Sequence, residues 1–231
     1  MIFDTFVGPK RPIEWTLRFW PVLLISFIFA VIATWLSKKI ALKYGIVDKP
    51  DNTVKTHKEP IAYLGGLGIL AGFACGLLAG AWGFKDEVSK MLMSILTGAA
   101  IACFVGLIDD IYNLRPSHKM AGQVIASIPL IVAGILPSLN PFLSPFGLTM
   151  PHWLEWAAGV LIVILTVLGA TNSLNLLDGL DGLCAGVTAI ITIAMLLLSV
   201  HLATWGWSDV RDPVRMITCL ALVGGALGFL P

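Results

Sequence analysis

Two asparagines and two aspartates follow an uncharged stretch in the second half of the sequence. The run from Thr171 to Asp181 reads T-N-S-L-N-L-L-D-G-L-D, and the uncharged stretch before it begins at Trp156. Polar and ionisable groups at the end of a membrane segment are costly, so they are candidates for a functional site by default. Hard oxygen ligands of this kind suit Mg²⁺, which takes one or two of them and keeps several waters. The candidates are Asn172, Asn175, Asp178 and Asp181.

The spacing of these four side chains indicates whether they can lie on one face of a helix. They repeat every three residues, whereas a regular α-helix returns to one face at about 3.6 residues, so they need not share a helix face. Gly179 and Gly182 lie among the acids, and glycine is where a helix can end and the backbone can turn. The sequence therefore predicts a helix terminus that opens into a polar loop. The structural alternative is that the asparagines only cap the helix and that Gly179 is its C′ residue.

A second polar segment, residues 106–123, reads G-L-I-D-D-I-Y-N-L-R-P-S-H-K-M-A-G-Q. Asp109 and Asp110 end a long apolar stretch, and carboxylates at a helix C-terminus meet an unfavourable dipole that cations relieve. One interpretation is that the two carboxylates handle a metal ion or a proton, while Lys119 at the start of the next helix holds phosphate. The alternative is a plain helix boundary, in which the acids are solvated and Arg115 and Lys119 mark the membrane edge.

The third segment, residues 47–66, reads V-D-K-P-D-N-T-V-K-T-H-K-E-P-I-A-Y-L-G-G. Lys55, His57 and Lys58 could neutralise an anion such as phosphate, with ammonium groups and an imidazolium as donors. The alternative is a solvated basic loop that ends in a helix-packing glycine pair, Gly65 and Gly66.

The composition shows which elements must position these segments. Only 13% of the 231 residues are charged and 57% are hydrophobic, against about a quarter charged in an ordinary soluble domain. The sequence therefore predicts an all-α polytopic membrane protein. Seven uncharged stretches reach or approach the roughly 20 residues of a spanning helix: 19–36, 61–84, 91–108, 120–137, 156–170, 183–207 and 216–231. We expect an N-terminal tail, residues 1–16, and a single transmembrane domain of about seven helices, residues 17–231.

Two further features of the sequence bear on the class of protein and its extent. The formal net charge is +1, so no basic field indicates a nucleic-acid partner. The last stretch ends at G-F-L-P without the Lys, Arg, Trp or Tyr that usually flank a membrane helix. We therefore expect that the chain is truncated at its C-terminus and is part of a larger helical bundle.

The three polar segments fall on one side of the membrane when the stretches are threaded through it, because each pair is separated by two crossings. By the positive-inside rule that side is cytoplasmic, although lysines and arginines also occur on the other side. The opposite loop, residues 137–153, contains Pro141, Pro145 and Pro151 with several aromatic residues. Proline breaks regular helix, so we expect an extended segment at the interface.

Together the three segments resemble the polyprenyl-phosphate N-acetylhexosamine-1-phosphate transferase family. The resemblance covers residues 47–231 and rests on D-x-P-D…K-x-H…P…G-G, D-D…L-R-P…K…Q and N-S-L-N-L-L-D-G-L-D-G-L. The last motif is highly specific, and the order of the three adds to that specificity. The resemblance implies a multi-pass enzyme of the inner (plasma) membrane that faces the cytoplasm and uses Mg²⁺, with Mn²⁺ as an alternative.

By this resemblance, the enzyme transfers HexNAc-1-phosphate from a UDP-HexNAc to a polyprenyl phosphate, such as undecaprenyl phosphate, and releases UMP. The reaction would start the assembly of a cell-envelope glycan such as peptidoglycan, teichoic acid or lipopolysaccharide O-antigen. The D-x-P-D…K-x-H arrangement looks more like the branch that uses UDP-N-acetylglucosamine. A homodimer in the lipid bilayer is also compatible with the resemblance.

The resemblance assigns roles to the candidate residues and leaves open whether the transfer takes one step or two. The implied catalytic residues are Asp109, Asp110 and Asp178, the metal ligands are Asn175 and Asp178, and the substrate-binding residues are Lys55, His57, Lys119, Asn172 and Asp181. Val54 departs from the Arg that family members often carry, which affects the expected substrate affinity. A later F-M-G-D-x-G-S motif and a His-containing loop are absent, so an alternative is a fragment or homologue that cannot catalyse alone.

Two other functions fit parts of the pattern. An ion- or proton-coupled transporter also carries acids at helix ends near glycines, but its ionisable groups belong near the bilayer midplane on discontinuous helices, with inverted repeats. A membrane prenyltransferase also uses Asp-rich motifs with Mg²⁺, but spaces its acids by three or four residues on helices. The acids at one membrane edge and the absence of a sequence repeat favour the phosphotransferase.

Overall fold

The computed structural model describes residues 12–45, 47–48, 61–62, 64–84, 87–177, 182–205 and 208–230. The elements are α1 (Pro12–Tyr44), β1 (Val47–Asp48), β2 (Ile61–Ala62), α2 (Gly65–Ala81), α3 (Glu87–Tyr112), α4 (Pro116–Val132), α5 (Asn140–Leu143), η1 (Ser144–Phe146), α6 (His152–Leu177), α7 (Leu183–Trp205) and α8 (Arg211–Phe229). The all-α class is confirmed. Among the described residues the only strands are β1 and β2, which pair antiparallel with Val47 opposite Ala62.

The protein is a multi-pass membrane protein. Five helices in the described part of the chain are long and apolar enough to cross a membrane: α1, α3, α6, α7 and α8. Each of the seven uncharged stretches overlaps one long helix, but α2 and α4 have only 17 residues each, fewer than the roughly 20 of a full span. Length alone therefore gives five spanning helices where the sequence predicted about seven. The first helix also begins earlier than expected, at Pro12.

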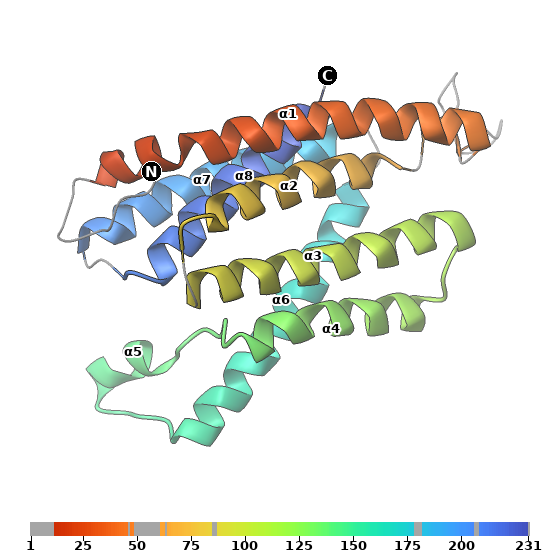
Figure 1. The fold of residues 1–231 in the computed structure, drawn as a ribbon. Helices are drawn as coiled ribbons and strands as arrows, with labels where there is room; N and C mark the ends of the chain where they lie inside the picture. The colour runs from red at the N-terminus through yellow and green to blue at the C-terminus, as the bar shows by residue number, and fades with distance from the viewer. Residues whose placement is uncertain are drawn as a thin grey trace.

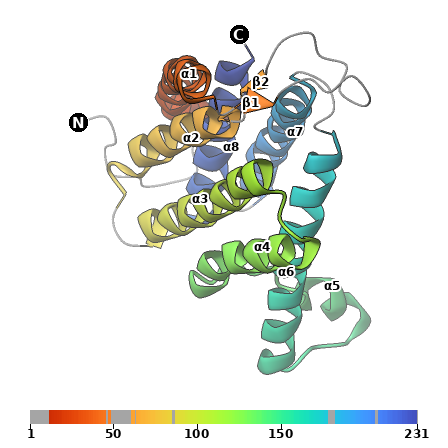
Figure 2. The same ribbon diagram turned by 90° about the vertical axis from the view of Figure 1, so that its right-hand side faces the viewer.

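The long helices run back and forth, as Figure 1 shows. The connection from α3 to α4 lies at the same end of the bundle as the end of α1 and the beginning of α2. Figure 2 shows that α6 crosses behind α4. Strand β2 contacts α1. The paired strands bring together the two ends of the segment that contains Lys55 and His57, although those two residues lie outside the described ranges.

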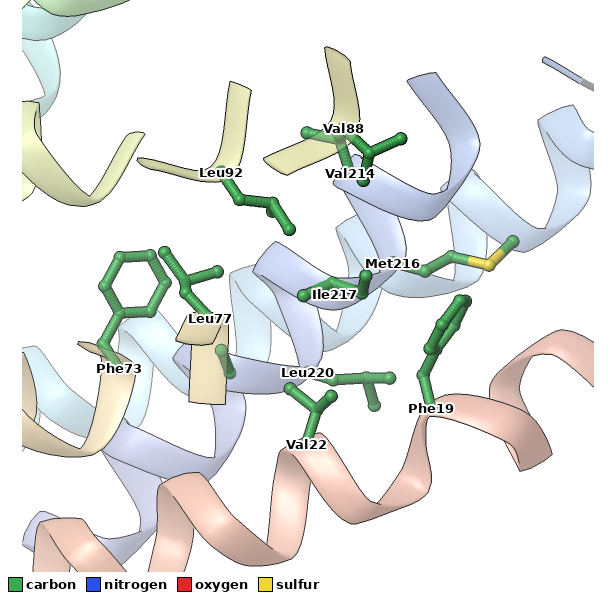
Figure 3. Close-up of a cluster of buried hydrophobic side chains, with 11 residues drawn as sticks. Phe19, Val22, Phe73, Leu77, Val88, Leu92, Val214, Met216, Ile217 and Leu220 are labelled. Carbon is green, nitrogen blue, oxygen red and sulfur yellow. The ribbon is translucent and has the colours of Figure 1, made fainter. Parts of the chain in front are cut away.

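Helix α8 is the centre of the packing. It contacts α1, α2 and α7. In its most apolar stretch of 18 residues 67% of the residues are buried, against 0% in the corresponding stretch of α6. A cluster of buried apolar side chains surrounds its first turns (Figure 3). We call this cluster the apolar core; its larger members are Phe19, Val22, Phe73, Leu77, Val88, Leu92, Val214, Met216, Ile217 and Leu220. The apolar core lies at the opposite end of the bundle from the α3–α4 connection.

Helices α1 and α8 approach closely along a row of small residues. A Cβ added to Gly224 would lie 2.5 Å from the Leu23 carbonyl oxygen, and one added to Gly228 would lie 2.5 Å from that of Phe27. Small residues spaced by four let membrane helices pack backbone to backbone. The Ser26 hydroxyl uses this proximity to donate a hydrogen bond of 2.5 Å to the Ala221 carbonyl oxygen.

The loop between α4 and α6 differs from the extended segment that the sequence predicted. It contains the short helices α5 and η1, because Pro141 and Pro145 stand in their first turns, where a missing N–H costs nothing. Glu155 holds the loop in place by accepting hydrogen bonds from the Ser138 hydroxyl at 2.5 Å and from Asn140 Nδ2 at 2.8 Å. Prolines therefore start short helices here and do not prevent them.

Candidate active site

The α3–α4 connection places Asp109 at the mouth of the bundle. Asn113 takes a left-handed conformation, with φ of 49°, and ends α3 in the way that asparagine and glycine commonly do. The turn brings the Leu114 N–H to Asp109 Oδ1 at 3.1 Å. Pro116 then begins α4. The backbone of the turn thus fixes one oxygen of the carboxylate and leaves the other to face α4.

Lys119 joins three helices. Its ammonium lies 2.7 Å from Asp109 Oδ2 in an ion pair, and the side chains of the pair are 20% and 19% exposed. The same ammonium donates a hydrogen bond to Asn175 Oδ1 in the last turns of α6. A cation therefore sits between a carboxylate oxygen and an amide oxygen in a partly buried position, where water screens the interaction less than at an open surface.

A second contact between α4 and α6 lies one turn deeper. Asn172 Nδ2 donates a hydrogen bond to Gln123 Oε1 at 3.0 Å and another to the Leu168 carbonyl oxygen at 2.8 Å. Gln123 is buried, with 3% of its surface exposed. The two contacts form a ladder, with Lys119–Asn175 as its outer rung and Gln123–Asn172 as its inner rung.

The structure brings together four of the predicted residues: Asp109, Lys119, Asn172 and Asn175. Asp110 lies on the same turn of α3 but is exposed, and neighbouring helix positions point about 100° apart. The remaining predicted residues lie outside the described ranges: Lys55, His57, Asp178 and Asp181. In the described part of the chain, no group of three His, Cys, Asp or Glu side chains could hold a metal ion.

Helix α6 continues further than the sequence suggested. It ends at Leu177, so Asn172 and Asn175 belong to its last turns and do not stand in a polar loop. Gln123 is the residue of the ladder that sequence reasoning did not assign to the site. Its signal was present, because a glutamine is the only strongly polar side chain in the otherwise apolar residues 120–137, and such residues in membrane helices usually face the bundle interior.

A cavity of about 570 Å³ lies at the other end of the bundle. It is lined mainly by apolar side chains from α3, α4, α6 and α8, with Arg211 and Arg215 at the beginning of α8. None of the ladder residues lines it, so the cavity and the polar site are different places in the molecule.

Comparison with known proteins identifies the family. The family model described as glycosyl transferase family 4 matches residues 92–231. The chain belongs to glycosyl transferase family 4. The matched region contains the whole ladder and Asp109, so the polar site lies inside the part of the chain that defines membership.

Individual relatives of this family 4 chain point in the same direction. It is 33% identical to an undecaprenyl-phosphate alpha-N-acetylglucosaminyl 1-phosphate transferase of Salmonella typhi over 145 residues. The aligned region covers 59% of the chain and 38% of the relative. It is 28% identical to a decaprenyl-phosphate N-acetylglucosaminephosphotransferase of Mycolicibacterium smegmatis over 214 residues. This aligned region covers 90% of the chain and 52% of the relative. The chain thus spans about half, or less, of the length of these curated relatives.

Proposed function

We propose that the full-length protein transfers N-acetylglucosamine-1-phosphate from UDP-N-acetylglucosamine to a polyprenyl phosphate and releases UMP. The sugar and the lipid acceptor follow the names of the relatives. The observation that carries the proposal is the Lys119 ammonium between Asp109 and Asn175, within the region that matches the family. This arrangement supports a transferase over a transporter, because it offers a fixed cation to phosphate at the edge of the bundle.

The reaction brings several negative charges together. An oxygen of the lipid phosphate attacks the β-phosphorus of the nucleotide sugar, and the bond from that phosphorus to the bridging oxygen breaks as UMP leaves. Catalysis of phosphoryl transfer depends mostly on positioning and on neutralising charge. Lys119 can supply that neutralisation, and Asp109 can orient its ammonium or accept a proton. The amides of Asn175 and Asn172 can orient phosphate or sugar oxygens.

The described residues are compatible with a Mg²⁺ requirement. Asp109 and Asn175 place a carboxylate oxygen and an amide oxygen around a single cation, the Lys119 ammonium. Mg²⁺ is usually held by one or two carboxylates together with substrate phosphates, and not by a cage made only of protein ligands. We propose Asn175, with Asp178 from the chain that follows α6, as the residues that hold it, while Asp109 remains the partner of Lys119. Bound Mg²⁺, or Mn²⁺ in its place, would stabilise charge on the pyrophosphate.

The membrane setting supports a cytoplasmic site in the plasma membrane. The segment between α1 and α2 carries Lys49, Lys55 and Lys58, and Arg115 and Lys119 lie at the beginning of α4. Positively charged loops tend to remain cytoplasmic. A UDP-sugar donor is a cytoplasmic metabolite class, and a polyprenyl phosphate presents its headgroup at the membrane surface. We propose no separate protein partner beyond a second copy of the chain in a homodimer.

The test is UMP release by the full-length protein in detergent or nanodiscs. With Mg²⁺ present, UMP should form from UDP-N-acetylglucosamine only when a polyprenyl phosphate is added. Asp109→Asn should lower the rate by about 10²-fold or more, because it removes the charge that orients Lys119. Glu87→Gln is the matched control, since it removes one exposed carboxylate from the other end of the same helix. Acceptor-independent UMP release, or equal rates for the two variants, would contradict the assignment.

A further inference from the structure

The inner rung of the ladder is a pair of amides in the membrane part of the bundle. Gln123 on α4 is buried, and it meets Asn172 on α6 at 3.0 Å. A polar side chain in such a place is costly unless its hydrogen bonds are satisfied. The pair therefore requires a structural or functional reason.

The Leu168 carbonyl fixes which way the Asn172 amide points. A backbone carbonyl oxygen can only accept a hydrogen bond, so the Asn172 atom that faces Leu168 at 2.8 Å must be its nitrogen. That nitrogen also faces Gln123, so the atom of Gln123 at 3.0 Å must be its oxygen. Both amide orientations follow from one backbone group, and the two hydrogens of the Asn172 amide are both used.

In this orientation one polar atom of the Asn172 amide can still make a further interaction. With both hydrogens engaged, only Oδ1 can still make a hydrogen bond or meet a cation. Asn172 and Asn175 are three residues apart on α6, and Lys119 and Gln123 are four apart on α4, so each pair forms a neighbouring row on its helix. The inner rung thus also sets how α6 meets α4 at the outer rung, where Lys119 reaches Asn175.

We propose that Gln123 is a positioning residue of the transferase. By accepting the second amide hydrogen of Asn172, beside the one that the Leu168 carbonyl accepts, Gln123 holds the Asn172 side chain and the last turns of α6 in register with Lys119. The inference rests on the proposed function for its reaction, and on the ladder for its geometry. Gln123 acts through Asn172 and does not itself touch the reacting phosphates.

The experiment compares three substitutions in the full-length protein. Gln123→Met keeps the size but removes the acceptor oxygen, and should lower kcat by about tenfold or more with a smaller change in KM, because misplaced groups slow the chemical step. Gln123→Glu keeps an acceptor oxygen in either protonation state and should stay within a few-fold of wild type. Ser127→Ala is the control on the same helix, because that buried hydroxyl donates its hydrogen bond to the Val124 carbonyl of its own helix, and it should leave kcat unchanged.

A double-mutant cycle separates positioning from a general loss of structure. If Gln123 acts through Asn172, the Gln123→Met, Asn172→Ala double variant should be no slower than Asn172→Ala alone, whereas independent residues give losses that multiply. Multiplying losses, or a Glu variant as slow as the Met variant at equal folded fraction, would overturn the inference.

The same cycle distinguishes this inference from the proposed function. If wild type releases no UMP, the proposed function fails, and the pair is judged from the midpoints of thermal unfolding without substrate. A non-additive double variant in that measurement supports the orientation of the pair, and an additive one overturns it.

Discussion

At one end of the bundle, α1, α2 and α8 meet through apolar side chains and close backbone contact, whereas at the other end polar side chains join α3, α4 and α6, in addition to the close approach of Gly122 on α4 to Val105 on α3. The first end contains the apolar core, and the Gly224 and Gly228 contacts extend from it along α1 and α8. The second end contains Asp109 and the two rungs of the ladder. The difference indicates that stability is concentrated around α8, while α6 is positioned largely by groups that can also do chemistry.

The largest effect that this comparison predicts is on activity without loss of fold. Lys119→Ala should lower kcat/KM by at least about 10²-fold, because it removes a fixed cation aimed at developing negative charge. The thermal midpoint should change little, since the pair is at the edge of the bundle. Lys119→Arg should recover part of the rate, because it restores the charge but not the geometry of an ammonium.

Lys90→Ala is the control for that prediction. Lys90 is an exposed cation near the beginning of α3, at the end with the apolar core. Its removal should leave kcat/KM near wild type. A large loss of thermal stability in Lys119→Ala would contradict the assignment of stability to the end with the apolar core and of activity to the polar end.

The next effect is on stability at the packed end. Gly224→Ala should destabilise the protein by about 1–3 kcal/mol, because the new Cβ would lie 2.5 Å from a backbone oxygen and 2.8 Å from Ser26 Cβ. Gly186→Ala on α7 should have the opposite sign, since within the described residues nothing lies within 4 Å of its added Cβ. Alanine in a helix interior is favoured over glycine by about 0.8–1 kcal/mol. Thermal unfolding of the two purified variants measures the contrast, and shifts of the same sign would contradict it.

The smallest effect concerns the hydrogen bond between α1 and α8. Ser26→Ala removes the donor to the Ala221 carbonyl and should lower stability by about 0.6 kcal/mol, the average for such bonds between membrane helices. Transferase activity per folded molecule should not change. Ser127→Ala removes a hydroxyl that bonds within its own helix, so a loss as large as that of Ser26→Ala would show that the contact between helices adds nothing.

The sequence predicted where the helices lie along the chain better than it predicted which helices pack against one another. Each apolar stretch became a helix because its length and composition suffice for that inference, and counting crossings placed Asp109 and Asn175 at one end. The choice of neighbours was not predictable, because helices that are apolar all round carry no clear face in their periodicity. The central place of α8 depends on close contacts such as that of Gly224 with Leu23, which only the folded arrangement shows.

Within the site, residue types were predictable and pairings were not. The charges of Asp109 and Lys119 and the two asparagines marked them as candidates, since each is costly in a membrane segment. Their contacts depend on the turn at Asn113 and on the continuation of α6 to Leu177, which spacing alone could not settle. Gln123 was part of the second motif but was assigned no role, because it carries no charge and stands apart from the acids.

The transfer of labelled phosphorus tests the central claim most directly. UDP-N-acetylglucosamine labelled at its β-phosphorus would be incubated with the full-length protein, Mg²⁺ and a polyprenyl phosphate, and the lipid phase would then be extracted. The account predicts that the label moves into the lipid with the sugar, while the same experiment with α-labelled donor leaves the label in UMP. Release of UDP that carries both phosphates, or β-label that stays in the aqueous phase, would contradict sugar-phosphate transfer at this site.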